Sequence, residues 1–206
     1  WLARRPVADH FHIRPALDRD MARLARLQSR TAVGLVLAGG GARGFAHLGV
    51  LRALQEHGVE IDCVGGTSMG SLMAALVAAD RPLDEMMRIA REAFRTNPTG
   101  DFNLLPLVSL IRGKRMKAAI QRALGALTGG DVDVEDLWKN HFCVATNYSQ
   151  AREEVLTRGN LRRALTASAA IPGALPPVVR DGDLLCDGGT FNNYPVDVMK
   201  ARRGIG

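Results

Sequence analysis

The sequence has few cysteines and no long apolar run, and each shortage excludes a class of protein. The three cysteines, Cys63, Cys143 and Cys186, include no Cys-x-x-Cys pair, so neither a disulfide framework nor a zinc site is expected. Each lies in an apolar stretch typical of a strand, which predicts small buried side chains in a reducing, cytoplasmic compartment. No segment approaches the roughly 20 apolar residues that a membrane-spanning helix requires.

Aromatic residues are also scarce, and this affects how the positive charge is interpreted. They make up 5% of the 206 residues, while 27 Lys and Arg against 21 Asp and Glu give a formal charge of +6. Nucleic-acid-binding surfaces interleave basic and aromatic side chains, and without that pattern no nucleic acid is expected. A solvated basic face is the simplest account. An anionic surface at the inner face of the membrane fits the charge better than nucleic acid does.

The chain length suits one well-buried domain and is short for two. Residues 1–30 form a basic N-terminal arm, in which apolar residues at helical spacing predict a short helix over 18–27. Because the chain begins at Trp1 without an initiator methionine, we expect it to be an excised piece of a longer protein.

Two strand–turn–helix units follow the arm. Residues 31–38 are a near-continuous apolar run, which predicts a strand buried on both faces, and a helix is expected over 45–57. Residues 61–65 predict the next strand and 71–79 the next helix. Two such units in succession imply an α/β fold with a parallel sheet and right-handed crossovers.

The remaining chain continues to alternate between predicted helices and strands. An acidic turn at 131–136 fits a helix start better than a calcium site. Residues 97–113 predict a long loop with an apolar centre, either packed on the body or acting as a lid or membrane-contacting loop. We expect helices over 83–95, 114–127 and 161–170, strands over 141–147 and 154–157, and a hairpin over 178–186 with Asp-Gly at its turn.

Gly66-Thr67-Ser68-Met69-Gly70 lies between the second predicted strand and its helix. A turn this tight crowds the backbone on both sides of the serine, which explains Gly66 and Gly70. The serine would project from the sheet edge at a helix N-terminus, where free N–H groups favour developing negative charge. The pattern predicts the nucleophile elbow of a serine hydrolase. The alternative is a chance match around a buried serine.

A glycine-rich loop, Gly39-Gly40-Gly41-Ala42-Arg43-Gly44, follows the first predicted strand. Its spacing also fits the G-x-G-x-x-G fingerprint of dinucleotide-binding oxidoreductases. That fold needs an acid at the carboxyl end of the next strand to hold the ribose, whereas Asp62 lies near the beginning of that strand. The N–H groups of the loop could equally face an oxyanion beside Ser68, so the hydrolase hypothesis accounts for both loops.

A nucleophilic serine needs a proton acceptor. In α/β-hydrolases a histidine follows the acid, but no histidine follows Asp187 in this chain. Asp187 ends an apolar strand and precedes Gly188 and Gly189, so its carboxylate could approach Ser68 directly. A plain turn aspartate is the alternative, and the spacing alone favours neither. The five histidines are His10, His12, His47, His57 and His141.

Taken together, GGGARG (39–44), GTSMG (66–70) and DGG (187–189) resemble the patatin-like phospholipase family, and the surrounding sequence is most similar to bacterial relatives of neuropathy target esterase. The resemblance covers residues 30–200. It implies a three-layer α/β/α sandwich with a mostly parallel central sheet. It also implies that residues 31–206 form a patatin-like hydrolase domain that is truncated at its C-terminus.

The resemblance further implies a Ser–Asp dyad, with Ser68 as nucleophile and Asp187 as general base. The loop from Gly39 to Gly44 would form the oxyanion hole, chiefly through backbone amides around Gly40, Gly41 and Ala42, and Arg43 matches the basic position of the family's loop. The implied reaction is hydrolysis of (lyso)phospholipid esters through an acyl-enzyme, with no metal or cofactor. The sequence assigns no oligomeric state. A catalytically silent lipid-binding module stays open as a further alternative.

Overall fold

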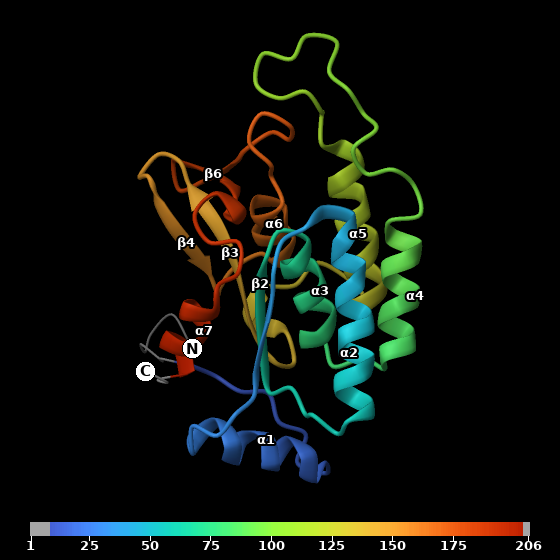
Figure 1. The fold of residues 1–206 in the computed structure, drawn as a ribbon, viewed down its shortest axis with the longest axis vertical. Coiled ribbons are helices and arrows are strands. Elements are labelled where there is room, and N and C mark those ends of the chain that lie inside the picture. Colours follow the sequence, from blue (N-terminus) through green and yellow to red (C-terminus); the bar gives the residue numbers. More distant parts are fainter. Residues whose placement is uncertain (1–8, 204–206) are drawn as a thin grey trace.

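The computed structural model describes residues 9–203 and has a six-stranded mixed sheet at its centre (Figure 1). The strand order is β1-β2-β3-β6-β5, and β4 also pairs with β3. The expected α/β class, with parallel strands at the centre, is confirmed. Four strands run in one direction: β1 (Gly34–Leu37), β2 (Cys63–Thr67), β3 (Asn140–Asn147) and β5 (Val178–Arg180). The two that run in the opposite direction are β4 (Arg152–Leu156) and β6 (Asp183–Asp187).

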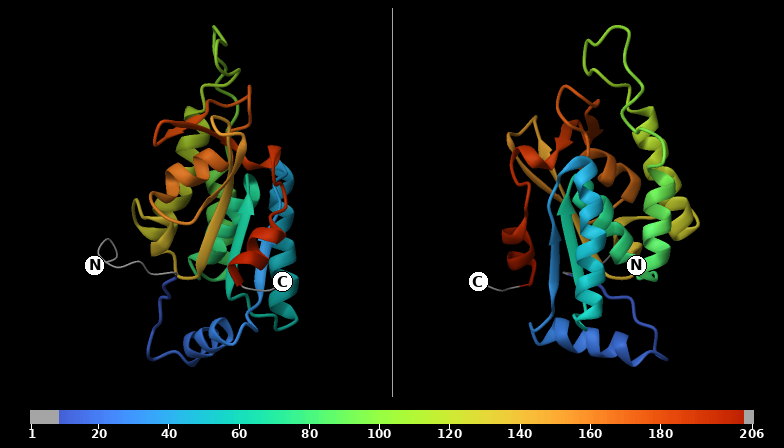
Figure 2. Two further views of the ribbon diagram at one scale, coloured as in Figure 1. Left: turned by 90° about the vertical axis from the view of Figure 1, so that its left-hand side faces the viewer. Right: turned by 45° about the vertical axis from the view of Figure 1, so that its right-hand side comes forward.

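Helices cover both faces of the sheet, unequally. Helices α2 to α6 lie on one face and α7 on the other, with the sheet between them (Figure 2). The boundaries of α1 to α6 lie within a few residues of those expected from the sequence, whereas α7 was not predicted. The helices are α1 (Asp18–Gln28), α2 (Ala46–Glu56), α3 (Met69–Ala78), α4 (Leu83–Ala93), α5 (Lys114–Thr128), α6 (Leu161–Ser168) and α7 (Val196–Arg203).

The main core surrounds α3, and all ten residues of this helix are buried. Its sequence, MGSLMAALVA, is apolar or small all round, as expected of a helix packed between a sheet and other helices. A smaller cluster on the opposite face joins Cys63 and Phe142 of the sheet to Met199 of α7. Cys143 and Cys186 are also buried, and all three cysteines are free thiols. Because every residue of α3 is buried, packing in the core holds the helix in place, including its first turn at the end of β2.

The fold corrects one expectation about local structure, the length and burial of the first strand, and refines another, the acidic turn. The strand expected over 31–38 is shorter, and the expectation that it is buried on both faces is wrong: Gly34 is exposed and, within β1, Leu37 alone is buried, because β1 is an edge strand of the sheet formed by residues 9–203. The acidic turn is a short 3-10 helix, Val134–Asp136, in which Asp133 and Asp136 form a reciprocal capping box. Within residues 9–203, no group of three or more His, Cys, Asp or Glu side chains is arranged to hold a metal ion.

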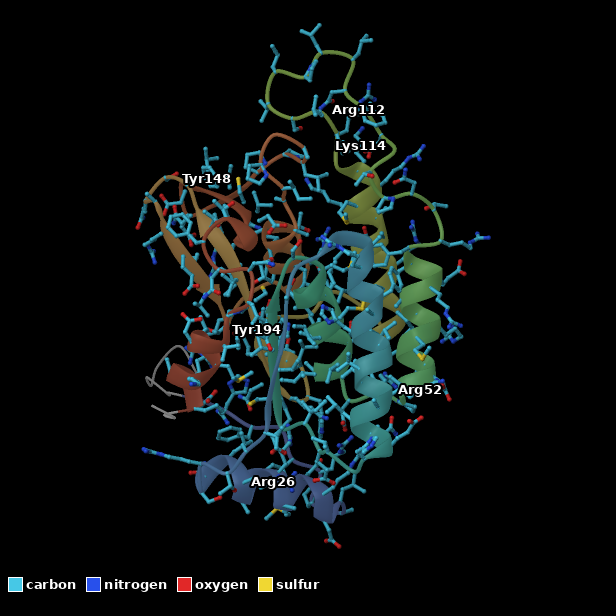
Figure 3. The ribbon with its side chains drawn as sticks, in the orientation of Figure 1. Arg26, Arg52, Arg112, Lys114, Tyr148 and Tyr194 are labelled. Carbon is cyan, nitrogen blue, oxygen red and sulfur yellow. The ribbon has the colours of Figure 1, made fainter. Side chains whose placement is uncertain are left out.

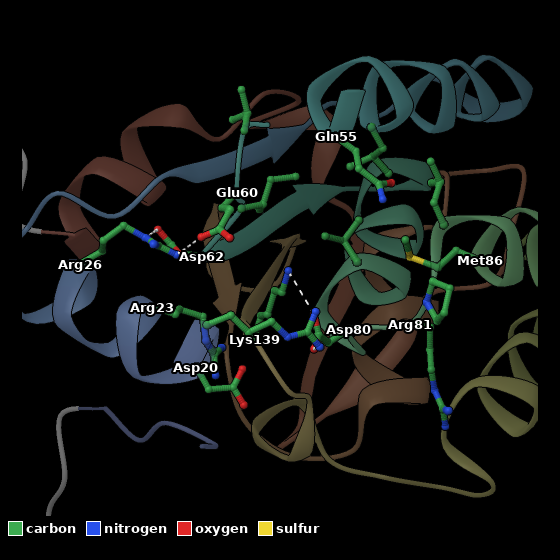
Figure 4. A pocket seen from close by; sticks show the side chains of 17 residues that line it. Asp20, Arg23, Arg26, Gln55, Glu60, Asp62, Asp80, Arg81, Met86 and Lys139 are labelled. Atoms are coloured by element: carbon green, nitrogen blue, oxygen red, sulfur yellow. Dashed lines mark hydrogen bonds and ion pairs between the residues drawn. The ribbon is translucent and has the colours of Figure 1, made fainter. Parts of the chain in front are cut away.

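The described part of the basic arm, residues 9–30, packs at the amino ends of the strands (Figure 1). The remaining arm residues, 1–8, and the last three residues of the expected domain lie outside the described residues. Arg26 of α1 bonds the fully buried Asp62 at 2.7 Å. A cavity of about 430 Å³ lies beside this pair, lined largely by charged side chains such as those of Lys139 and Asp80 (Figure 4). Its place at this end of the sheet separates it from the serine loop.

The long loop over 97–113 stands away from the body at the other end of the molecule (Figures 1 and 2). An antiparallel bridge between Phe102 and Ile111 closes it. The side chain of Leu104 at its tip is 92% exposed, so the expectation of a connection packed on the body is wrong.

Candidate active site

Ser68 occupies the turn between β2 and α3, as the sequence predicts. Its backbone has φ 54° and ψ −127°, a left-handed conformation that is costly for a residue with a side chain. Ser68 is half-buried, whereas Thr67 and Met69 on either side are buried. The turn therefore directs this one side chain away from the core.

Close backbone packing explains the two glycines of the turn. A Cβ atom on Gly66 or on Gly70 would overlap the carbonyl oxygen of Leu37, at the end of β1. That oxygen belongs to the backbone of a sheet strand and has little freedom to move. Only glycine at both positions lets the turn sit this close to β1.

The pairing along β3 brings Ser68 and Asp187 together. Thr67, the last residue of β2, pairs with Val144, and Asp187, the last residue of β6, pairs with the following residue, Ala145. Because β4 occupies the other side of both positions, β2 and β6 lie end to end along one edge of β3. The residue after β2 therefore meets the final carboxylate of β6.

Asp187 is 7% exposed and is held through its backbone and side chain. Its N–H donates to the Ala170 carbonyl at 2.8 Å, and its carboxylate accepts the Gly189 N–H at 2.8 Å. Burial raises the pKa of the Asp187 carboxyl, while hydrogen bonds from the Ser68 hydroxyl and the Gly189 N–H act in the opposite direction. A carboxylate made more basic by burial, next to a hydroxyl, is chemically suited to accept its proton.

The glycine-rich loop lies against the serine turn. A Cβ atom on Gly39 would come within 3.0 Å of the Ser68 Cβ, and one on Gly44 would overlap the Met69 side chain. The loop continues into a 3-10 helix, Gly41–Phe45, whose first N–H groups belong to Gly41 and Ala42. The opening turn of a helix leaves its first N–H groups without intrahelical partners. Together with the Gly40 N–H, they follow directly in sequence the glycine that contacts Ser68.

Two further members of the glycine loop differ in their accessibility. The Gly39 N–H donates to the Asn193 carbonyl at 3.2 Å, so this amide is already engaged within the chain. The Arg43 side chain is exposed. The Arg43 N–H is also engaged, because it donates to the Gly40 carbonyl at 3.2 Å, so the amides of Gly40, Gly41 and Ala42 stay the candidates for the oxyanion hole predicted over 39–44.

Sequence reasoning gave no role to Ser168, which supports the serine turn from α6. Its hydroxyl accepts the Ser68 N–H at 2.9 Å and donates to the Val144 carbonyl at 2.6 Å, and the residue has no exposed surface. The two bonds thus connect the Ser68 amide to β3 through the Ser168 hydroxyl. Ser168 is 100 residues from Ser68 in the sequence, and no local pattern marks this contact.

The five histidines all hydrogen-bond backbone carbonyls. None of these bonds involves Ser68 or Asp187. The His47 ring hydrogen-bonds the Ala38 carbonyl, just before the glycine loop. Burial lowers the pKa of His141 to about 4. The carbonyl partners are Glu135 for His10 and His12, Ala38 for His47, Ala53 for His57 and Ser71 for His141.

The geometry does not favour dinucleotide binding at the glycine loop. Asp62, the acid nearest to β2 on its amino side, is fully buried and bonded to Arg26 at the amino end of the strand. The carboxyl end of β2, where a ribose acid would be needed, carries Ser68 instead.

Across residues 9–203, no helix has the length and apolar character needed to traverse a bilayer.

Comparison with known proteins shows the family. The sequence model of the patatin-like phospholipase family matches residues 35–200, so the chain belongs to this family. It is 40% identical over 203 residues to "Lysophospholipase NTE1" of Eremothecium gossypii, covering 96% of this chain and 12% of that protein. It is 39% identical over 191 residues to "Neuropathy target esterase sws" of Drosophila melanogaster, covering 90% and 13%.

A solved structure shares the fold. VipD from Legionella pneumophila superposes with a TM-score of 0.56 at 17% identity, covering 79% of this chain and 46% of that one. The resemblance to the patatin-like family deduced from three short motifs is confirmed by the family model and by the curated relatives. The chain spans about an eighth of the length of the two curated relatives named above.

Proposed function

We propose that this chain hydrolyses carboxylic ester bonds of (lyso)phospholipids, with Ser68 as nucleophile and Asp187 as general base. The observation that carries the proposal is the end-to-end placement of β2 and β6 along β3, which sets the two side chains against each other. The names of the relatives, a lysophospholipase and an esterase, support the choice of reaction and of lipid substrate.

The first step transfers the acyl group to the serine. Asp187 accepts the Ser68 hydroxyl proton while the Ser68 oxygen attacks the ester carbonyl carbon. The carbonyl oxygen becomes an oxyanion, held by the amides of Gly40, Gly41 and Ala42, and losing one such donor typically costs about 10²–10³ in rate. The ester C–O bond then breaks, and Asp187 returns the proton to the departing alcohol.

The second step releases the fatty acid. Asp187, again ionised, takes a proton from a water molecule, and the resulting nucleophile attacks the acyl-enzyme carbonyl. The Ser68–acyl bond breaks and the serine oxygen recovers its proton from Asp187. The products are a free fatty acid and the deacylated lipid, and every group of the site returns to its starting state.

Release of fatty acid from lysophosphatidylcholine by the full chain tests the proposal. We expect Ser68→Ala and Asp187→Asn each to lower kcat by at least about 10³-fold, because each removes one partner of the proton transfer. Asp183→Asn is the matched control. It makes the same carboxylate-to-amide change at the far end of β6, where Asp183 bonds Asn147 at 2.8 Å.

The outcomes separate the enzyme from the silent lipid-binding module. Full activity in Asp183→Asn, with loss in the other two variants, supports the dyad. An active Asp187→Asn enzyme would rule out Asp187 as the base. A folded parent chain that hydrolyses neither lysophosphatidylcholine nor a soluble short-chain ester would favour the module.

A further inference from the structure

The loop between α4 and α5 has an inverted distribution of polar and apolar side chains. Ser109 is buried at its centre, and its hydroxyl donates to the Ile111 carbonyl at 2.8 Å. The Asn103 amide donates to the Ser109 carbonyl at 2.8 Å. The large apolar side chains, in contrast, face outward: Phe102, Leu104, Leu105, Leu107, Val108 and Leu110 are between 57% and 92% exposed.

The loop is braced by its own hydrogen bonds despite this exposure. Besides the bridge between Phe102 and Ile111, the Asn103 N–H donates to Leu110 at 2.9 Å and the Arg112 N–H to Asp101 at 2.7 Å. A loop that merely lacked a packing partner would have no reason to hold its polar groups inside. The arrangement instead suits an apolar surrounding, where backbone and side-chain polar groups must be satisfied internally.

Positive charge gathers at the base of the loop. From residue 102 to residue 117 the sequence contains four basic residues and no acidic one. All four side chains are exposed, and Arg112 and Lys114 lie where the loop joins α5 (Figure 3). We call these four basic residues at the base of the loop the basic collar. An apolar tip above this collar complements an anionic lipid surface, whose headgroups carry negative charge above an apolar interior. The four residues are Arg112, Lys114, Arg115 and Lys117.

The base of the loop is connected to the candidate active site. The N–H groups of Leu110 and Ile111 donate to the carbonyls of Gly173 and Ala174 at 2.8 and 2.9 Å. The same segment accepts, through the Ala170 carbonyl, the N–H of Asp187. The loop therefore stands at the sheet end that carries Ser68 and Asp187, on the opposite end from α1 (Figure 1).

We propose that residues 102–110 insert into the interface of an anionic lipid membrane, with the basic collar on its headgroups, and thereby hold the Ser68 end of the sheet against the lipid. The lipid substrate of this inference rests on the proposed function, whereas the docking itself does not require catalysis. A second copy of the chain or another protein would call for no basic collar. These alternatives are outcomes of the test.

The test measures co-sedimentation of the 206-residue chain carrying Ser68→Ala with vesicles of phosphatidylcholine, alone or mixed with phosphatidylserine. We expect Leu104→Ser/Leu107→Ser to weaken binding to the mixed vesicles at least tenfold, because burying one leucine in an apolar phase is worth about a factor of ten. Arg112→Gln and Lys114→Gln should each weaken it about fivefold, on the mixed vesicles only. Val50→Ser, which changes an exposed aliphatic side chain on α2, is the control and should bind like the parent.

Three results would overturn the inference: a parent that does not bind the mixed vesicles, equal binding by the double leucine variant, or self-association that this variant abolishes without changing vesicle binding. Hydrolysis of a soluble short-chain ester by the chain with Ser68 intact is measured in parallel. If the ester is cleaved but vesicles are not bound, only the docking proposal fails. If vesicles are bound but no ester is cleaved, the proposed function fails and docking stands.

Discussion

Ser168→Ala is the substitution that best tests how α6 supports the serine turn. It removes one hydroxyl from a site with no exposed surface. The change breaks the 2.9 Å bond from the Ser68 N–H and the 2.6 Å bond to the Val144 carbonyl. The side chain shrinks by one atom, so the effect comes from the two bonds rather than from a large cavity.

The expected loss of stability is about 2 kcal/mol. A net hydrogen bond contributes about 0.5–1.5 kcal/mol, and a buried donor left without a partner costs about 1–3 kcal/mol. For a domain of this size, that loss lowers the Tm by about 4–8 °C. Ser68 also loses the bond that holds its left-handed backbone, and a nucleophile displaced by about 1 Å costs up to about 100-fold in rate. We expect kcat to fall at least tenfold with KM little changed.

The assay combines urea unfolding of the full chain with hydrolysis of a soluble short-chain ester. Thr166→Ala is the control, because Thr166 lies on the same helix and its hydroxyl donates to the Arg162 carbonyl, a local bond within that helix. Both stability and kcat should stay close to the parent values in that variant. A Ser168→Ala protein with the kcat and unfolding free energy of the parent would refute the reasoning.

Three other predictions follow from single contacts. Gly70→Ala places a Cβ against the Leu37 and Ala38 carbonyls and should lower the unfolding free energy by about 3 kcal/mol or more. Gly125→Ala is the control, because a Cβ there meets open space, and thermal unfolding should show no loss of stability in that variant. Because only the ionised base accepts a proton, kcat/KM should fall on acidification through a pKa above the usual value of about 3.9 for aspartate; an inflection at or below that value contradicts the buried base. Burial lowers the pKa of His141 from its ordinary value of 6.5 to about 4, so between these pH values the unfolded chain binds a proton that the folded chain does not. The unfolding free energy should therefore fall by up to about 3 kcal/mol as the pH drops from 6.5 to 4, and urea unfolding of His141→Asn should show a smaller change.

The serine turn and the glycine loop could be predicted from the sequence because local backbone geometry demands their residues, whereas the role expected of Asp187 came from the family resemblance. Gly66 and Gly70 are needed wherever a turn approaches a strand this closely, so the pattern is visible within five residues. The strands and helices on either side also follow from local periodicity. Their alternation along the chain is enough to predict the α/β class.

Contacts between distant segments could not be predicted in this way. Ser168 bonds Ser68 across 100 residues, and its role depends on how α6 docks on β3. The loop over 97–113 illustrates a second limit, since its apolar residues have the composition of a buried segment. Whether such residues face inward depends on the polar bonds of Asn103 and Ser109, which the sequence order does not reveal.

Labelling with a fluorophosphonate probe, followed by mass mapping of the adduct, tests the central claim most directly. The probe reacts with an activated serine and not with an ordinary hydroxyl, so we predict one adduct on Ser68 in the full chain. The Ser68→Ala protein should carry none, and labelling should weaken in Asp187→Asn, where the amide cannot accept the proton. An unlabelled, folded parent, or an adduct on a different serine, would contradict the assignment of Ser68 as the nucleophile.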